Sequence, residues 1–218
     1  TSVICRDDVF SDGAVIVYIN DDHAPSVRAR HGFMPAEGSR EMKVTSAEGN
    51  LVAELDGRPA AEAYREELVR LGLMNEGESF IHAAAKYSLG IRSLWGEKLK
   101  IRTPLSESSS GIVFAGAVMQ GSGVRVVVSS PEMMIDAAGH MMTDVIGSLG
   151  DDPSAVIVID CAGRWNLLAD RYAEQISAFV SGSRAPLIGF ASYGEIAKSQ
   201  GAMDGFHNTT SVAAAWRK

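Results

Sequence analysis

Three segments of the chain carry polar side chains directly beside apolar runs, where a plain core does not need them. The first is Asp160-Cys161-Ala162-Gly163-Arg164, which follows the apolar run Val156–Ile159. A buried strand that ends here would place Cys161 and Arg164 at its carboxyl end, where ligands bind in open α/β sheets. The N-terminus of a following helix would also attract anions. The alternative is a core cysteine beside a surface arginine, since free cysteine is often buried.

The second segment is the turn Tyr193-Gly194-Glu195, which lies between apolar flanks. It offers one phenol and one carboxylate on a tightly shaped loop. Gly194 could supply a positive φ or let the backbone approach a ligand closely. The alternative is an ordinary strand exit in which Glu195 pairs with an arginine at a rim.

The third segment is Phe206-His207-Asn208-Thr209-Thr210, which leads into the last apolar run. His207 could act as a base, a ligand contact or a pH-sensitive switch. It could equally be a hydrogen-bonded structural residue. Asn208 could make an Asx-turn that holds the entry of the chain into the strand.

The elements that must position these segments are strands and helices in mixed order. Several apolar runs are typical of strands, and some of them are apolar at successive positions, as in strands covered on both faces. The runs are Ala14–Ile19, Gly111–Val118, Val124–Val128, Ala155–Ile159, Pro186–Ala191 and Thr210–Trp216. The spacing of apolar residues predicts helices from Pro59 to Leu71, after the capping-box sequence Ser129-Ser130-Pro131-Glu132, and from Arg164 to Gly182.

The order of these elements is not a strict alternation of strand and helix. Val113–Val118 and Val124–Val128 are joined by the short connection Met119–Gly123, which predicts a hairpin. We therefore predict an α+β fold, with a mixed or antiparallel β-sheet core covered by helices.

Composition excludes several classes of protein. The 218 residues are 46% hydrophobic and 22% charged, which is typical of a globular domain with an ordered core. No apolar run approaches the roughly 20 residues of a membrane span. The net charge is −7, from 20 basic and 27 acidic residues without a basic stripe, so a nucleic acid is not an expected partner. Thr1 is no natural start, so we expect a chain cut at its N-terminus.

The cysteines and histidines indicate neither a disulfide framework nor a metal site. Cys5 and Cys161 are the only cysteines and lie far apart, which favours a reducing, cytoplasmic location. No histidine has a second ligand at a zinc-binding spacing, so we expect no metal and no cofactor.

Taken together and in this order, the three segments resemble the C-terminal half of the FIST sensory domain. The stretch from Val44–Asn50 through Leu55–Ala60 resembles the opening of that half. Cys161-Ala162-Gly163-Arg164 is similar to its Cys-x-x-Arg turn. The closing signature of the C-terminal half is similar to three segments of this chain: Gly189-Phe190, Tyr193-Gly194-Glu195 and His207-Asn208-x-Thr210. On this resemblance residues 42–218 form the FIST C-terminal domain. Residues 1–41, with Phe10–Val15, are then the tail of the FIST N-terminal domain.

The resemblance implies an intracellular signal-input domain that binds a small ligand such as an amino acid and acts with a signalling output protein. The ligand-binding residues that it implies are Cys161, Arg164, Tyr193, Gly194, Glu195, His207, Asn208 and Thr210. Arg164 would clamp a carboxylate through paired hydrogen bonds, and Glu195 would bind an ammonium group. Tyr193, His207 and Asn208 would orient the ligand.

Two other functions stay open at this point. In a protein-interaction scaffold, Arg164 and Glu195 would form a buried pair that holds the fold. In a cysteine-dependent enzyme, Cys161 would have a lowered pKa at a helix N-terminus, with His207 as its base. The sequence favours the non-catalytic ligand sensor.

Overall fold

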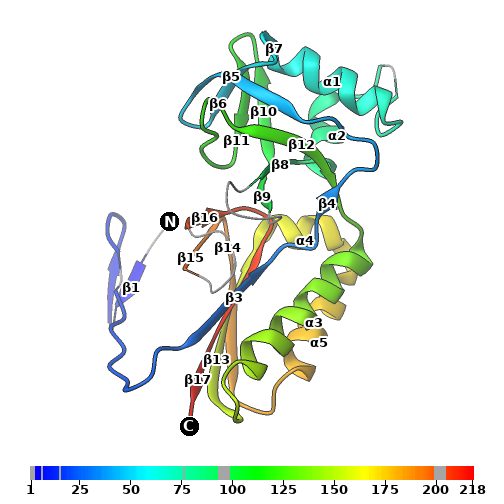
Figure 1. The fold of residues 1–218 in the computed structure, drawn as a ribbon. Coiled ribbons are helices and arrows are strands. Elements are labelled where there is room, and N and C mark those ends of the chain that lie inside the picture. The colour runs from blue at the N-terminus through cyan, green and yellow to red at the C-terminus, as the bar shows by residue number, and fades with distance from the viewer. Residues whose placement is uncertain (1–2, 6, 15, 76, 93–98, 199–204) are drawn as a thin grey trace.

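The computed structural model describes residues 3–5, 7–14, 16–75, 77–92, 99–198 and 205–218. Figure 1 shows the main body of the chain as two lobes, one above the other. Both lobes combine β-sheet with helices, which confirms the predicted α+β class.

The lower lobe is built on a sheet with the strand order β14 (Leu187–Ser192), β13 (Pro153–Cys161), β17 (Ser211–Arg217) and β3 (Ser26–Arg30). The β13–β14 pair is parallel, and the other two pairs are antiparallel. This mixed sheet confirms the three strands predicted in the C-terminal third of the chain. The helices α3 (Pro131–Gly147) and α5 (Tyr172–Ser181) lie on one face of the sheet (Figure 1).

The helix α3 confirms the helix predicted after the capping box, and Met134, Ala138, Met141 and Val145 are buried on one of its faces. Its N-cap is Ser130, whose hydroxyl accepts a hydrogen bond from the Met133 N–H at 3.2 Å. Ser129, the first residue of the predicted capping box, instead donates to the Gly32 carbonyl at 2.6 Å. The predicted helix start is therefore right to within one residue.

The predicted helix from Arg164 to Gly182 is wrong as a single helix. The helix α4 (Ala162–Leu168) directly follows β13, and a 3₁₀ turn at Ala169–Arg171 separates it from α5. Ala169 has a φ of 47°, which interrupts the helical path. The break lets α5 turn back over α4, so that Gln175 faces Arg164.

The upper lobe is an antiparallel sheet with the order β10 (Pro104–Ser108), β11 (Gly111–Phe114), β6 (Leu51–Leu55), β5 (Met42–Glu48), β12 (Gly123–Val128), β8 (Leu89–Arg92) and β9 (Leu99–Arg102). The short strands β4 (Met34–Pro35) and β7 (Arg58–Pro59) extend it. The helices are α1 (Ala60–Arg70), which was predicted, and α2 (Phe80–Lys86).

The predicted hairpin between Val113–Val118 and Val124–Val128 is wrong. The strand β11 pairs with β10 and β6, whereas β12 pairs with β5, β8 and β4. The connection between them runs along β5 instead, because the Gly121 N–H donates to the Val44 carbonyl and the Val44 N–H donates to Ser122. A short connection therefore crosses the sheet rather than closing a hairpin.

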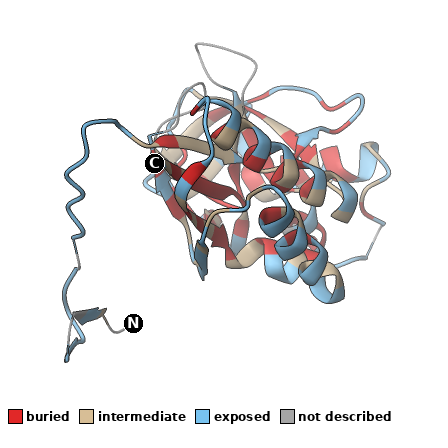
Figure 2. Cartoon of the chain, turned by 90° about the horizontal axis from the view of Figure 1, so that it is seen from below, coloured by how far each residue is buried: buried red, intermediate tan, exposed pale blue. Residues whose placement is uncertain are grey.

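The N-terminal segment lies away from both lobes (Figure 2). It contains the paired strands β1 (Val3–Cys5) and β2 (Asp8–Phe10). The strand predicted over Ala14–Ile19 is wrong for its described residues, where Ile16 is 89% and Tyr18 is 87% exposed. No neighbouring strand offers these residues a partner within the described chain.

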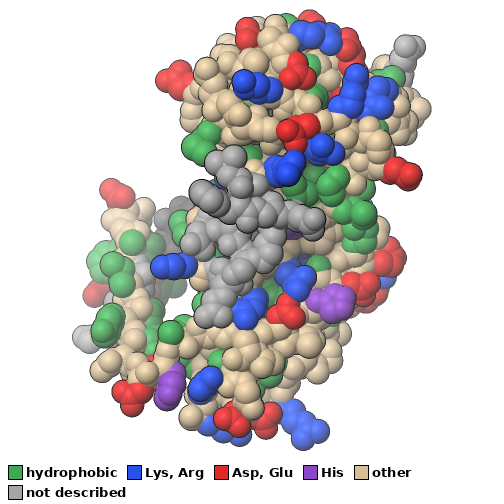
Figure 3. Space-filling view, viewed as in Figure 1, with side chains coloured by type: hydrophobic (Ala, Val, Ile, Leu, Met, Phe, Trp, Pro, Cys, Tyr) green, Lys and Arg blue, Asp and Glu red, His purple; other side chains and the backbone are tan. Residues whose placement is uncertain are grey.

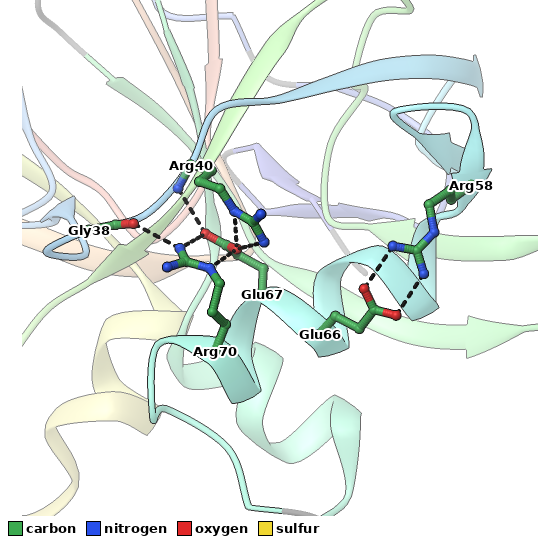
Figure 4. A network of polar contacts seen from close by, with 6 residues as sticks. All are labelled: Gly38, Arg40, Arg58, Glu66, Glu67 and Arg70. Carbon is green, nitrogen blue, oxygen red and sulfur yellow. Dashed lines mark hydrogen bonds and ion pairs between the residues drawn. The ribbon is translucent and has the colours of Figure 1, made fainter.

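A buried glutamate anchors α1 to the segment that precedes β5 (Figure 4). The Glu67 side chain is 1% exposed, and its Oε1 accepts a hydrogen bond from the Arg40 N–H at 2.8 Å. The guanidinium groups of Arg40 and Arg70 both donate to the same carboxylate. Two cations thus compensate one buried anion.

The two lobes meet at a small apolar cluster. Ile101 of β9 and Val127 of β12 come from the upper lobe, and Met134 of α3 and Leu168 of α4 come from the lower lobe. Phe33 packs with them. This cluster holds β9 next to the C-terminal segments in which the sequence predicts the functional residues.

Candidate functional site

A buried polar network occupies the carboxyl end of β13. Asp160 is 3% exposed, and its carboxylate accepts hydrogen bonds from Ser211 at 2.5 Å, Gln175 at 2.7 Å and Tyr172 at 2.9 Å. Its Oδ1 also lies 3.3 Å from Nε of Arg164. The network joins β13, β17, α4 and α5 into one platform.

Arg164 lies at the centre of this network and is fully buried. Its Nε and Nη2 both donate to Gln175 Oε1, at 3.0 and 2.5 Å, and Nη2 also donates to the Met134 carbonyl at 2.9 Å. Its Nη1 donates to the carbonyls of His31 at 2.6 Å and Thr209 at 3.5 Å. Every guanidinium nitrogen thus has a protein acceptor, which leaves no obvious donor for a ligand.

A short hairpin lies beside this platform and contains the second and third predicted segments. In it, β15 (Glu195–Ala197) pairs with β16 (Gly205–His207), and Glu195 is opposite His207. Gly194 has a φ of 153°, and a Cβ there would lie 2.3 Å from Cζ of Phe206. The tight turn therefore requires glycine, as the sequence predicts, because the Phe206 ring fills the space of a side chain.

Glu195 is a buried carboxylate, only 2% exposed. Its Oε1 accepts a hydrogen bond from the Ser192 hydroxyl at 2.7 Å. Its Oε2 is buried and accepts no hydrogen bond of normal geometry from the described residues. Burial raises the pKa of Glu195 to about 7, although Ser192, the Cys161 thiol and the Thr210 N–H favour the charged form. A carboxylate with this pKa is poised between its two protonation states at neutral pH.

Cys161 lies next to Glu195 and is 6% exposed. Burial and the negative charge of Glu195 raise the pKa of its thiol. A nucleophilic cysteine needs the opposite shift. The condition on which the cysteine-enzyme hypothesis depends is therefore not met.

The loop before β17 is fixed by threonine hydroxyl groups. Thr210 Oγ1 donates to the Asn208 carbonyl at 2.8 Å, and Thr209 Oγ1 lies 3.0 Å from Thr103 Oγ1 of the upper lobe. Asn208 is 3% exposed, and its Oδ1 accepts no hydrogen bond from the described residues. The predicted Asx-turn at Asn208 is therefore wrong, because Thr210 makes the local contact instead.

The structure brings most of the predicted residues to one place. Cys161, Glu195 and Thr210 are in direct contact through the interactions described above. His207 and Asn208 are adjacent in the chain and buried. Tyr193 is 95% exposed and lies at the rim of the cluster rather than in it. Arg164 lies beneath the cluster, bonded to Thr209.

Sequence reasoning did not predict the role of several residues of the site. Asp160 begins the first polar segment, but its position in the sequence indicates no specific role. Gln175 and Tyr172 come from α5, beyond a helix break that the periodicity does not show. His31 is half-buried, and burial and the nearby Arg164 lower its pKa to about 4. Arg102 of β9, which donates to the Phe206 carbonyl, lies in a strand without distinctive sequence.

The fold and this cluster define an α+β domain with a buried polar site, without a metal cluster among the described residues. Residues 60–198 match the FIST C domain, and residues 1–58 match the FIST N domain. The chain therefore belongs to the FIST family, as its motifs predict. FIST domains are sensory domains of signalling proteins. The division at residue 41 stays a prediction.

No curated protein and no solved structure matches the chain significantly. Within the described residues, no helix has the length and apolar character that crossing a membrane requires. On the face in Figure 3, Lys and Arg side chains lie among Asp and Glu side chains rather than in one basic stripe. This distribution agrees with the scattered charges of the sequence.

Proposed function

We propose that this FIST chain is an intracellular, non-catalytic signal-input domain that binds an amino acid or another small carboxylate. The site is the cluster around Glu195, which includes Cys161, His207, Asn208 and Thr210. Gly194 and Tyr193 form its rim. A signalling output protein would receive the signal, and a cytoplasmic location suits this role.

One observation carries the proposal: Oε2 of the buried Glu195 carboxylate accepts no hydrogen bond of normal geometry from the described residues, although the Cys161 thiol and the Thr210 N–H favour its charged form. No lysine or arginine of the described chain forms an ion pair with it. An unsatisfied buried polar group costs about 1–3 kcal/mol. A ligand ammonium group would supply the missing donor and charge, and Asn208 Oδ1 offers it a second acceptor.

In this proposal Arg164 positions the site instead of clamping the ligand. Its donors hold the loop at Thr209 and the segment at His31. The carboxylate clamp predicted from the sequence would require Arg164 to release these acceptors. We therefore assign Arg164 to the platform beneath the ligand.

A thermal-shift screen of the wild-type chain against amino acids and small carboxylates tests the proposal. A ligand that binds only the folded state raises the melting temperature. Glu195→Gln should weaken binding of a ligand with an ammonium group by about 10- to 100-fold. Glu174→Gln, which changes an exposed carboxylate, is the matched control. Equal binding in both variants, or no stabilising ligand, would contradict the proposal.

A protein-interaction scaffold is the second candidate. It is favoured by Arg164, whose partners are all protein groups. The pair that this alternative predicts from the sequence is Arg164 with Glu195, whereas the ion pair in the structure is with Asp160. If a substitution of Arg164 lowers the stability of the protein without changing the binding of any ligand, the scaffold function is supported.

A further inference from the structure

Arg102, the last residue of β9, is a deeply buried cation of the upper lobe. Its side chain is held by three backbone carbonyls and the residue is 5% exposed. Nε donates to Ala117 at 2.8 Å, and Nη1 donates to Ile101 at 2.9 Å and to Phe206 at 3.3 Å. These carbonyls belong to β9, to the β11–β12 connection and to β16, so Arg102 links the two lobes.

The charge of Arg102 is not compensated. No carboxylate in the described part of the chain forms an ion pair with it, and burial is the sole cause that lowers its pKa. The other deeply buried charges of the platform and of α1 do have counter-charges: Arg164 has Asp160, and Glu67 has two arginines. An unpaired buried charge is costly, so an anion that binds at Arg102 would reduce this cost.

The surroundings of Arg102 leave one nitrogen for such an anion. A Cβ on Gly116 would lie 3.2 Å from Arg102 Nε and 3.0 Å from the Phe206 ring. Gly116 thus lets the guanidinium and the ring pack against the backbone. Among the described residues Nη2 donates no hydrogen bond, and its two N–H groups are available.

Arg102 contacts the same hairpin that carries Glu195. The Phe206 carbonyl that accepts from Arg102 directly precedes His207, which is opposite Glu195. One residue after Arg102, Thr103 contacts Thr209 at 3.0 Å. The hairpin therefore joins a buried acid without a cation and a buried cation without an acid, and they come from different lobes.

We propose that Arg102 binds the carboxylate of the small ligand through Nη2, so that one ligand contacts both lobes. This inference rests on the proposed function, because it names the second charged contact of the same site. The ligand class is then a small carboxylate with a separate cationic group. Binding would fasten β9 to the β15–β16 hairpin and so change how firmly the lobes are joined.

Two single-charge probes separate this inference from the proposed function. Sodium acetate and methylammonium chloride are each tested by thermal shift against sodium chloride at equal ionic strength. Acetate should stabilise the wild type, and Arg102→Gln should weaken acetate binding by about 10- to 100-fold. Methylammonium should respond to Glu195→Gln and not to Arg102→Gln. Arg92→Gln, which changes an exposed arginine of the neighbouring strand, should leave both probes unchanged.

If acetate does not bind the wild type, or binds Arg102→Gln as tightly as the wild type, the proposed role of Arg102 is overturned. Methylammonium or amino-acid binding that still depends on Glu195 then leaves the proposed function intact. If no probe and no amino acid binds, both fail. Should Arg102→Gln not fold, Arg102→Lys replaces it. Lys keeps the charge but lacks the reach of Nη2, so unchanged acetate binding in that variant overturns the inference.

Discussion

Arg164 and Asp160 form a buried ion pair across one turn of chain, with 3.3 Å between Nε and Oδ1. The aspartate ends β13 and the arginine lies in the first turn of α4. The same guanidinium also reaches the carbonyls of His31 and Thr209. One side chain therefore holds together the strand, the helix and the loop that borders the candidate site.

Arg164→Lys should destabilise the protein although it keeps the charge. Lysine cannot reproduce the fork that serves five acceptors, and broken contacts to a buried pair cost about 3 kcal/mol or more. For a chain of this length that lowers the melting temperature by about 6–12 °C. Differential scanning calorimetry measures the change.

The control for Arg164→Lys is Arg30→Lys, because Arg30 pairs with Asp144 at the exposed surface. Exposed pairs contribute about 0–1 kcal/mol. Similar melting temperatures for the two variants would show that the buried network does not hold the fold.

Gly194→Ala should destabilise the β15–β16 hairpin by about 1–3 kcal/mol. The new Cβ would lie 2.3 Å from Phe206 Cζ, and the φ of 153° is unfavourable for alanine. Urea denaturation gives the loss of stability. Gly139→Ala, at a helical site with open space, should gain about 0.5–1 kcal/mol.

The steric cause of the Gly194 effect can be separated from the backbone cause. Phe206→Ala removes the ring that the new Cβ meets. The double variant Gly194→Ala/Phe206→Ala should therefore lose less stability than the sum of the two single variants. Strict additivity would show that the ring is not the obstacle.

Local sequence patterns predicted the elements that carry the platform. The strand order could not be predicted in this way, because it depends on pairing between strands far apart in the sequence. Local signals are the apolar run before Asp160 and the spacing of apolar residues along α1 and α3. Each of these depends only on neighbours within a few residues. The strand partners of β12 depend on residues far away in the sequence. The short connection from β11 therefore predicts a hairpin wrongly, because β5 and β8 occupy the two edges of β12.

The candidate site shows the same limit at the level of side chains. Its polar segments were found from sequence because each interrupts an apolar run. The role of Arg164 could not be found, since it depends on a helix break at Ala169 that turns Gln175 toward it. Arg102 had no signal at all, because its burial arises only where β9 meets the other lobe.

Glu67→Gln should reduce stability at neutral pH by about 2 kcal/mol. Burial alone would raise the pKa of Glu67, but hydrogen bonds from Arg70 and Arg40 prevail and lower it to about 2. This stabilisation is present above about pH 4.5 and is lost as the pH falls toward 2. Urea denaturation at pH 7 and pH 3 measures the change.

The control for Glu67 is Glu66→Gln, which removes an exposed pair with Arg58. Its effect on stability should be much smaller than that of Glu67→Gln at either pH, because solvent screens an exposed ion pair. An equally large loss for both variants, or a Glu67 effect that does not shrink in acid, would contradict the buried-anchor interpretation.

Cys161 should resist alkylation in the folded protein. Its thiol is buried and its pKa is raised by burial and by Glu195, so little thiolate is available for attack. In a Cys5→Ser background, iodoacetamide should react with Cys161 much more slowly than with glutathione at pH 8. Urea should restore the rate. Fast reaction in the native state would revive the cysteine-enzyme hypothesis.

Two buried groups act in opposite directions on the pH dependence of stability. The raised pKa of Glu195, about 7, means that the folded state holds this proton more tightly than the unfolded state. Its contribution therefore falls as the pH rises from about 4.5 through 7. The lowered pKa of His31, about 4, gives a contribution that rises with pH up to about 6.5.

Comparing the wild type with Glu195→Gln isolates Glu195, because His31 is present in both proteins. The free energy of unfolding of the wild type should fall relative to Glu195→Gln as the pH rises from 5 to 8, by at most about 3 kcal/mol. Urea denaturation at several pH values measures this difference. A saturating ligand with an ammonium group should reduce it, since the cation stabilises the charged carboxylate. A difference that is constant across this range would mean that Glu195 titrates normally and is not the desolvated acceptor that the proposed site requires.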